Sequence, residues 1–312
     1  MYYPYFRGKQ FELVTIRETA DLLAQSNFVP IIEPVKETLS GLERTLKVIC
    51  DAKGTAIVIV NPDYGDHAEG GGDISKLLNN GFSSATNIAA GILLKKGMSV
   101  DDAMQYHEQH NKHHPVFIHA GFAEPKALAE KFGDGLKTTP QVFVEKHCGG
   151  KLYWRHFKGC RRILLRDGFE KCKNADYREV DRFSELHATF AEEGMDGFGD
   201  FSIVGDTYSE GGGPAYAVAI HLTYIDPDQD DVMFIYHFIS TTNNTPTDPA
   251  GKFGQALAKL IGKLDSGKSK LFEGEAIAEF RDLHAKQHFP GLGYVKKLSM
   301  KHHLETLANF LT

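Results

Sequence analysis

Short apolar runs alternate with amphipathic segments over the first two thirds of the chain. Near-continuous apolar runs are typical of strands that are buried on both faces of a parallel sheet. Eight such runs predict strands at residues 2–6, 28–34, 55–62, 87–96, 115–121, 140–147, 161–168 and 201–206. Eight strands that are mostly separated by helices, within about 205 residues, favour an α/β fold of the TIM-like (β/α)8 barrel type.

Segments with apolar residues at helical spacing separate most of these strands. They predict helices at residues 10–24, 39–50, 73–79, 99–110, 124–132 and 178–193. Ser99 is a suitable N-cap for the fourth helix, because its hydroxyl can accept a hydrogen bond from the first turn. Residues 148–160 show no clear helical period. The missing helix leaves a doubly wound open sheet as the alternative fold, with its ligand at a topological switch point.

A different pattern begins after residue 206. Two apolar strands are predicted at 215–225 and 231–240, and the acidic turn between them indicates a β-hairpin. Three further helices are predicted at residues 251–264, 274–287 and 299–311. We expect a barrel over residues 1–206 and, over residues 207–312, a hairpin and helical extension packed on it as one structural unit. Since a two-stranded hairpin is marginally stable alone, it must pack on the C-terminal helices, extend another sheet or meet a second subunit.

Composition excludes several classes of protein. The net charge of −6 over 312 residues argues against broad electrostatic binding of nucleic acid. No apolar run approaches the roughly 20 residues that a membrane-spanning helix needs. The first residues lack the pattern of a signal peptide. The four cysteines contain no CxxC pair, so we expect reduced thiols in a cytoplasmic protein.

Polar residues follow the predicted strands, and function in a barrel belongs at the carboxyl ends of its strands. The candidate substrate-binding residues at these ends are Arg7, Lys9, Asn61, Arg166 and Asp167, and the candidate catalytic residues are Glu33, His119, Glu145 and Asp206. Such a set suits acid–base or metal-assisted chemistry on an anion, with a divalent metal ion as candidate cofactor. The simpler interpretation is that strand-end loops are solvated and carry polar residues in every barrel.

Glu33 is the most specific of these candidates, because it lies inside the apolar sequence "PIIEPV". An unpaired carboxylate near a core would be expensive. Its alternative role is therefore a buried salt bridge with Arg7 or Lys9. The sequence from Phe6 to Gly8 is similar to the His-Arg-Gly opening of glycerophosphodiesterase-type barrels, except that Phe6 stands in place of the histidine.

Asp206 precedes the glycine-rich sequence "SEGGG", whose glycines allow close approach of a ligand. The spacing matches neither the dinucleotide-binding fingerprint nor the P-loop. Asp206 therefore either faces a ligand at the barrel mouth or belongs to a connection between the barrel and the hairpin. His221 and His237 lie in the two hairpin strands, where they are either a metal-binding pair or hydrogen-bonded core histidines.

Several stretches together carry a family resemblance. "YPYFRGKQFEL", "PIIEPVKE", "DGFGDFSIVGDTYSEGGGPAYAVAIHLTYID" and "HFPGLGYVKKLSM" resemble a bacterial and phage-borne beta-protein family, over essentially the full length of the chain. The resemblance implies an intracellular protein and association with mobile elements or phage defence. It supplies no catalytic residues.

Two functions from different classes remain. The first is a barrel-mouth enzyme, such as a phosphodiesterase-like hydrolase, that acts on an anionic phosphate-ester or nucleotide-like substrate. The second is a non-catalytic sensor or scaffold subunit, which meets a protein partner or a second copy through the hairpin and C-terminal helices. Fold alone does not choose between them.

Overall fold

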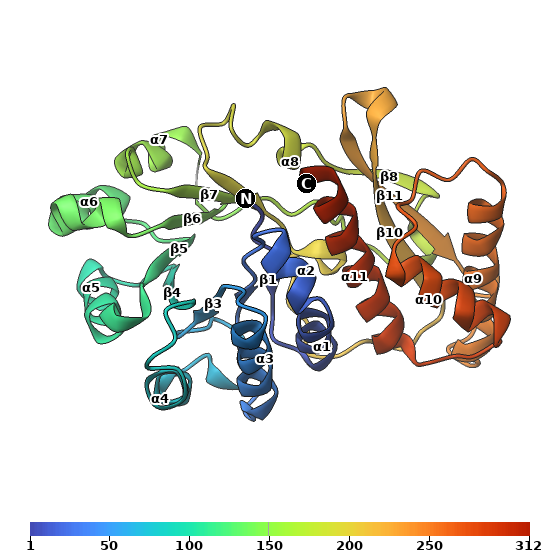
Figure 1. The fold of residues 1–312 in the computed structure, drawn as a ribbon, viewed down its shortest axis with the longest axis horizontal. Coiled ribbons are helices and arrows are strands. Elements are labelled where there is room, and N and C mark those ends of the chain that lie inside the picture. Colours follow the sequence, from blue (N-terminus) through green and yellow to red (C-terminus); the bar gives the residue numbers. More distant parts are fainter. Residues whose placement is uncertain (149) are drawn as a thin grey trace. The chain divides into compact units, whose positions relative to one another are not determined.

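The chain divides into two compact units, each built from two segments. The computed structural model describes residues 1–148 and 150–312. The first unit comprises Met1–Asp167 and Thr189–Phe201, and the second comprises Gly168–Ala188 and Ser202–Thr312. The second unit thus includes residues 168–188, which the sequence pattern assigned to the barrel. Figure 1 shows the elements of both units along the chain.

The first unit contains an all-parallel sheet of eight strands in the order β1-β2-β3-β4-β5-β6-β7-β9. The strands are β1 (Tyr5–Phe6), β2 (Ile31–Ile32), β3 (Ala56–Ile59), β4 (Ile88–Lys95), β5 (Val116–Ala120), β6 (Gln141–Val144), β7 (Arg162–Leu165) and β9 (Gly197–Gly199). The amides of Tyr3 and Tyr5 donate to Phe198 O and Asp200 O at 2.8 and 2.9 Å, which joins the last strand to the first. The sheet is therefore a nearly closed barrel, as predicted, and not an open doubly wound sheet.

The interior of the barrel is filled by alternate residues of the strands, because successive side chains of a strand point to opposite faces. Tyr5, Ile31, Ile59, Ile118 and Val142 belong to one buried apolar cluster. Their neighbours in sequence point outward, toward the helices.

Helices lie outside the ring of strands in Figure 1. They are α1 (Gln10–Glu18), α2 (Ala20–Gln25), α3 (Ser40–Asp51), α4 (Gly72–Gly81), α5 (Val100–Gln109), α6 (Pro125–Phe132) and α7 (Lys151–Trp154). The hydroxyl of Ser99 accepts a hydrogen bond from Asp102 N at 3.1 Å, which confirms the predicted cap of α5. Helix α7 lies in the link 148–160, where no helix was predicted, and Gly149 of that link is outside the described residues.

The prediction of an eighth strand at 201–206 is wrong. Ser202–Val204 is a 3-10 helix, and the strand that closes the barrel is β9. A Cβ on Gly199 would lie 2.0 Å from Tyr3 O, and one on Gly197 would lie 2.9 Å from Met1 O. The closing strand must therefore be glycine-rich, although glycine weakens the sequence signal of a strand.

The predicted helix at 178–193 is also wrong for most of its length. Val180–Ser184 forms strand β8, and only Leu186–Thr189 is helical, as α8. The apolar residues of this segment fit a helical period, but pairing of Phe234 with Arg182 and of Tyr236 with Val180 holds the chain extended. Pairing with a distant strand here outweighs the local pattern.

The second unit contains a three-stranded antiparallel sheet in the order β10-β11-β8. The predicted hairpin is confirmed as β10 (Ala219–Asp226) and β11 (Val232–Ile239), paired from Ala219–Ile239 to Asp226–Val232. The predicted helices are confirmed as α9 (Pro249–Asp265), α10 (Glu275–Ala285) and α11 (Leu292–Leu311). Among the described residues, no helix combines the length and the apolar character needed to cross a membrane.

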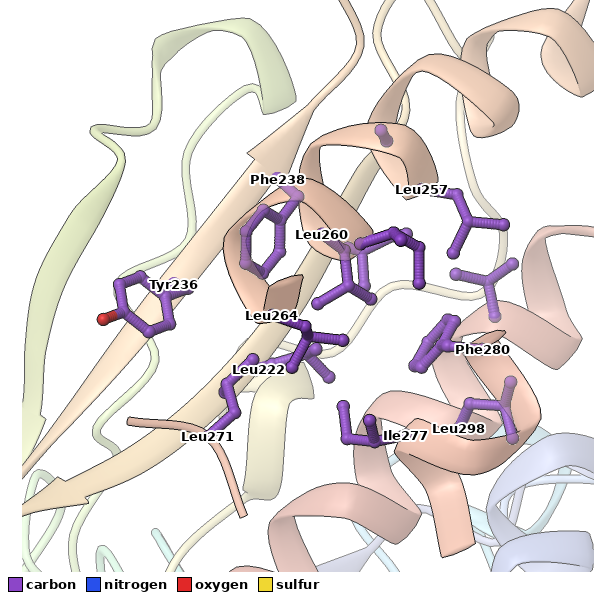
Figure 2. Packing of buried hydrophobic residues seen from close by; sticks show 14 of the residues in the cluster. Leu222, Tyr236, Phe238, Leu257, Leu260, Leu264, Leu271, Ile277, Phe280 and Leu298 are labelled. Carbon is purple, nitrogen blue, oxygen red and sulfur yellow. The ribbon is translucent and has the colours of Figure 1, made fainter. Parts of the chain in front are cut away.

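The hairpin packs against the C-terminal helices through one apolar core (Figure 2). Leu222, Tyr236 and Phe238 from the sheet meet Leu260 of α9 and Phe280 of α10 in this cluster. The hairpin thus gains both a third strand and a covering layer of helices within its own unit, so much of its apolar surface is already used.

Leu260 provides a test of this core. Leu260→Ala removes a fully buried side chain, so we expect it to lower the stability of the second unit by about 2–5 kcal/mol. Urea unfolding, monitored by far-UV circular dichroism, measures the change in stability. Leu152→Ala on α7 is the control, because Leu152 is 72% exposed. Equal unfolding midpoints for the two variants would contradict the packing in Figure 2.

Candidate functional site

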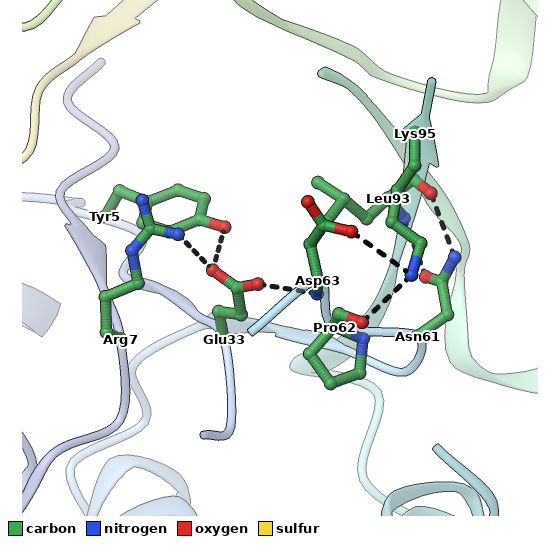
Figure 3. A network of polar contacts seen from close by, with 8 residues as sticks. All are labelled: Tyr5, Arg7, Glu33, Asn61, Pro62, Asp63, Leu93 and Lys95. Atoms are coloured by element: carbon green, nitrogen blue, oxygen red, sulfur yellow. Dashed lines mark hydrogen bonds and ion pairs between the residues drawn. The ribbon is translucent and has the colours of Figure 1, made fainter. Parts of the chain in front are cut away.

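The carboxyl ends of β1 to β4 bring a set of polar side chains to one end of the barrel, as Figure 3 shows. Tyr5 and Ile31 point into the barrel, so Arg7 and Glu33, two residues further along, lie on the same side of their strands. Asn61, Asp63 and Lys95 follow from β3 and β4. We call these residues, Tyr5, Arg7, Glu33, Asn61, Asp63 and Lys95, the mouth network.

Glu33 is the centre of the mouth network. Its side chain is fully buried and accepts hydrogen bonds from Tyr5 OH at 2.8 Å, from Arg7 and from the backbone amide of Asp63 at 2.9 Å. Gly8 makes this possible: its φ of +63° turns the chain after Arg7, and a Cβ there would lie 3.0 Å from Glu33 O. One carboxylate therefore joins β1, β2 and the loop after β3.

Arg7 forms the predicted buried salt bridge with Glu33. Its guanidinium carbon also lies 5.1, 4.7 and 5.6 Å from the ring centroids of Tyr5, Tyr64 and Phe201. Aromatic faces attract a cation, so these rings replace part of the solvation that the guanidinium loses on burial. The pair is fixed in position and mostly shielded from solvent.

Asp63 and Lys95 form a second, more open pair at the same end. Lys95 Nζ donates to Pro62 O at 3.0 Å and lies 3.5 Å from Asp63 Oδ1. The side chain of Asp63 is 50% exposed and that of Lys95 is 25% exposed. This pair is therefore the part of the mouth network that a molecule from solvent can reach.

Asn61 is at the mouth, but its amide contacts the sheet. Asn61 Nδ2 donates to Leu93 O at 2.9 Å, and Asn61 Oδ1 accepts from Leu93 N at 2.8 Å. Lys9, the other predicted binding residue near β1, is partly buried and precedes α1, where its backbone amide donates to Glu12 Oε2 at 3.3 Å.

His119 is not brought to the mouth network. It lies on β5 between Ile118 and Ala120, which face the interior, so its ring points to the helix layer. There Tyr153 OH lies 2.7 Å from Nδ1, and Gln141 Oε1 lies 2.8 Å from Nε2. Burial lowers the pKa of His119 to about 3, so the ring is a neutral hydrogen-bonded core group.

Glu145 and Arg166 are also directed away from the interior, since Val144 and Leu165 before them point inward. Arg166 Nε and Nη2 donate to the two carboxylate oxygens of Glu145 at 2.6 and 2.8 Å. Arg166 also donates to Glu193 at 2.7 Å. The two carboxylates raise the pKa of Arg166. Asp167, the next residue, is partly buried.

Asp206 belongs to the second unit, where it is buried. Its convergence with Glu33 in one site stays a prediction.

His221 and His237 face each other across the hairpin, with their Nδ1 atoms 2.6 Å apart. Two imidazole nitrogens on one tetrahedral zinc ion lie about 3.3 Å apart, so the geometry is that of a hydrogen bond. Asp181 Oδ2 lies 3.3 Å from His237 Nε2, and Tyr177 stacks on His237 at 4.4 Å. Within residues 1–148 and 150–312, no three His, Cys, Asp or Glu side chains are grouped to hold a metal ion.

Asp63 and Tyr64 are site residues that were not predicted. Both follow Pro62 in the loop after β3, and a proline has no N–H with which to continue the ladder of a central strand. Lys95 also ends an apolar run. A search for polar residues just beyond each strand end, rather than at the end itself, would have found Asp63.

Glu33→Gln tests the centre of the network. The substitution removes the charge that balances buried Arg7 and places an NH2 group against donors, so we expect a loss of about 3–5 kcal/mol of stability. Thermal and urea unfolding measure it. Glu37→Gln, at an exposed position four residues on, should change stability by less than about 0.5 kcal/mol. Similar values for both variants would show that Glu33 is not the structural centre.

Acid pH provides a second test. Burial lowers the pKa of His119 and His221 to about 3, and of His237 and His302 to about 4. The unfolded chain therefore binds protons at a higher pH than the folded chain. The stability from the neutral rings is complete above about pH 6.5 and is lost as the pH falls to about 4 for His237 and His302 and to about 3 for His119 and His221.

For the fully buried His119 and His302, the expected loss is about 1.4 kcal/mol per histidine for each pH unit below 6.5. Urea unfolding between pH 7.5 and 5 measures the slope. His119→Gln should reduce it, and His284→Gln, at an exposed position on α10, should leave it unchanged. Stability that does not change over this range would contradict the assignment of neutral buried rings.

No model of a protein family matches the chain, and no curated protein matches it. The resemblance to the beta-protein family therefore stays an expectation from the sequence. The function proposed below rests on the geometry of the mouth network.

Proposed function

We propose that the barrel is an enzyme whose mouth binds an anionic substrate of the phosphate-ester class through Lys95, with Asp63 as general base. The observation that carries this proposal is the open Asp63–Lys95 pair beside the buried Arg7–Glu33 pair. Active sites of barrel enzymes lie at this end of the strands. The two pairs differ in exposure, and this difference suggests different roles.

Lys95 is the ligand-binding group of the proposal. An ammonium is a compact point charge that suits phosphate oxygens. Its distance of 3.5 Å from Asp63 is longer than a good hydrogen bond, so the ion pair is loose. A ligand oxyanion can therefore take the place of the carboxylate at Lys95 without breaking a short bond.

Asp63 is the proton acceptor of the proposal. Its backbone amide is held by Glu33, whereas its carboxylate is half exposed. Once an anion occupies Lys95, the carboxylate accepts a proton from a water molecule as its oxygen attacks the phosphorus. The ester P–O bond breaks in the same step, and the alkoxide or phenolate leaves to solvent, where it takes up a proton. Lys95 then balances the negative charge that develops on the reacting phosphoryl group.

Arg7 and Glu33 hold the reacting groups of the proposal in position. Glu33 holds both Arg7 and the backbone of Asp63, so the charges of the mouth are oriented before a ligand arrives. Such preorganisation avoids the cost of reorienting groups during the reaction.

Lys95→Gln tests the binding step. Loss of one charged hydrogen bond costs about 1.5–3 kcal/mol, so the dissociation constant for inorganic phosphate should rise about 10- to 100-fold. Titration followed by NMR measures it. Lys96→Gln is the matched control, because Lys96 is the next residue and is exposed. Asp63→Asn should retain phosphate binding and lose hydrolysis of bis(p-nitrophenyl) phosphate. Equal phosphate affinity of the wild type and Lys95→Gln would refute the proposal.

A further inference from the structure

The junction of Asn61 and Pro62 interrupts the parallel ladder between β3 and β4. Ile59 is the last β3 residue in register with β4, opposite Gly91, and Val60 N donates to Gly91 O at 2.9 Å. Two residues further along, the regular pattern requires an amide at position 62 to donate to Leu93 O. Proline has no N–H, so Pro62 cannot supply this hydrogen bond.

The side chain of Asn61 supplies the missing ladder bonds. Its amide has an acceptor oxygen and an NH2 donor on the same edge of the group, so both can face the N–H and the C=O of one extended residue. The donor and the acceptor both bond to Leu93, since Asn61 Nδ2 donates to Leu93 O and Asn61 Oδ1 accepts from Leu93 N. Asn61 is buried, and this pairing extends the contact of β3 with β4 beyond the point where the backbone ladder ends.

The position of Leu93 determines where Lys95 lies. Lys95 is two residues after Leu93 on β4 and on the same face of the strand. On the β3 side of the Asn61–Leu93 pairing, Pro62 and Asp63 directly follow Asn61 in the chain. Lys95 Nζ lies 3.0 Å from Pro62 O and 3.5 Å from Asp63 Oδ1, so both partners of Lys95 lie within two residues of Asn61 in the chain (Figure 3).

We propose that Asn61 is a positioning residue that sets the geometry of the Asp63–Lys95 pair through Leu93. It does not contact the ligand, because its amide donor and acceptor are both engaged in the sheet. The effect on ligand binding rests on the function proposed above. The effect on Lys95 itself does not, so the two can be measured separately.

The first experiment needs no ligand. Brief acetylation of the folded protein with acetic anhydride, followed by mass spectrometry, gives the relative reactivity of Lys95 and Lys96. In Asn61→Leu, which is neutral and of similar size, we expect acetylation of Lys95 to rise at least threefold relative to Lys96. Asn61→Asp keeps the acceptor for Leu93 N and loses the donor, so an intermediate rise is expected. The Asn61→Asp variant still tests the role of Asn61 if Asn61→Leu folds poorly.

The matched control is Asn80→Asp, at an exposed position on α4, which should leave the Lys95 to Lys96 ratio unchanged. An unchanged ratio in both Asn61 variants would overturn the positioning role. That result would leave the proposed function standing, because phosphate binding by Lys95 is tested on its own.

A double-mutant cycle then tests the route of the effect. Asn61→Leu should weaken phosphate binding about tenfold when Lys95 is present and less than twofold in the Lys95→Gln background, because residues that act through one another are not additive. Equal losses in both backgrounds would overturn the assignment, since Asn61 would then act independently of Lys95. If the wild type binds no phosphate, the proposed function fails, and the acetylation ratio still decides the role of Asn61.

Discussion

A buried carboxylate in the barrel mouth sets the requirement that the rest of the site meets. Glu33 is fully buried at the end of β2, where an unbalanced charge would be very costly. The cost is offset by Arg7, by Tyr5 OH and by the amide of Asp63. Two of these donors lie in or directly after β1 and one lies in the loop after β3, whereas Glu33 itself follows β2, so the site forms only when all three parts are assembled. The same requirement fixes the positions of Arg7 and Asp63 before any ligand is bound.

The pleat of the strands decides which polar residues can act together. Arg7, Glu33, Asn61 and Lys95 lie on the inward-facing side of their strands, and they meet in one network. His119, Glu145 and Arg166 each lie one residue out of phase with the inward set, and they form their contacts elsewhere. Since side chains alternate along every strand, a shift of one residue separates a member of the mouth network from a structural group.

The second unit shows how a hairpin that is marginal alone becomes stable. The strand β8 comes from the segment between β7 and β9, and it adds a third strand to the hairpin. Helices α9 to α11 bury the apolar face of this sheet. Neutral histidines complete the packing: His221 bonds to His237, and His302 of α11 contacts Thr223 O at 2.9 Å. These rings are uncharged at neutral pH, because desolvation lowers the pKa of each of them.

The sequence by itself determined the fold class, most of the strands and helices, and the importance of Glu33. Apolar runs of strand length and a carboxylate inside one of them are local features, and local features can be read from the order of residues. The closing strand and β8 could not be predicted, because glycines at β9 are required by the approach of Tyr3, and β8 is held extended by β11. The grouping of Asp63 with Lys95, and the separation of both from His119, depended on strand register and on which face each residue takes. Only the tertiary structure decides these, because neighbouring strands of the barrel are joined by hydrogen bonds between residues far apart in sequence.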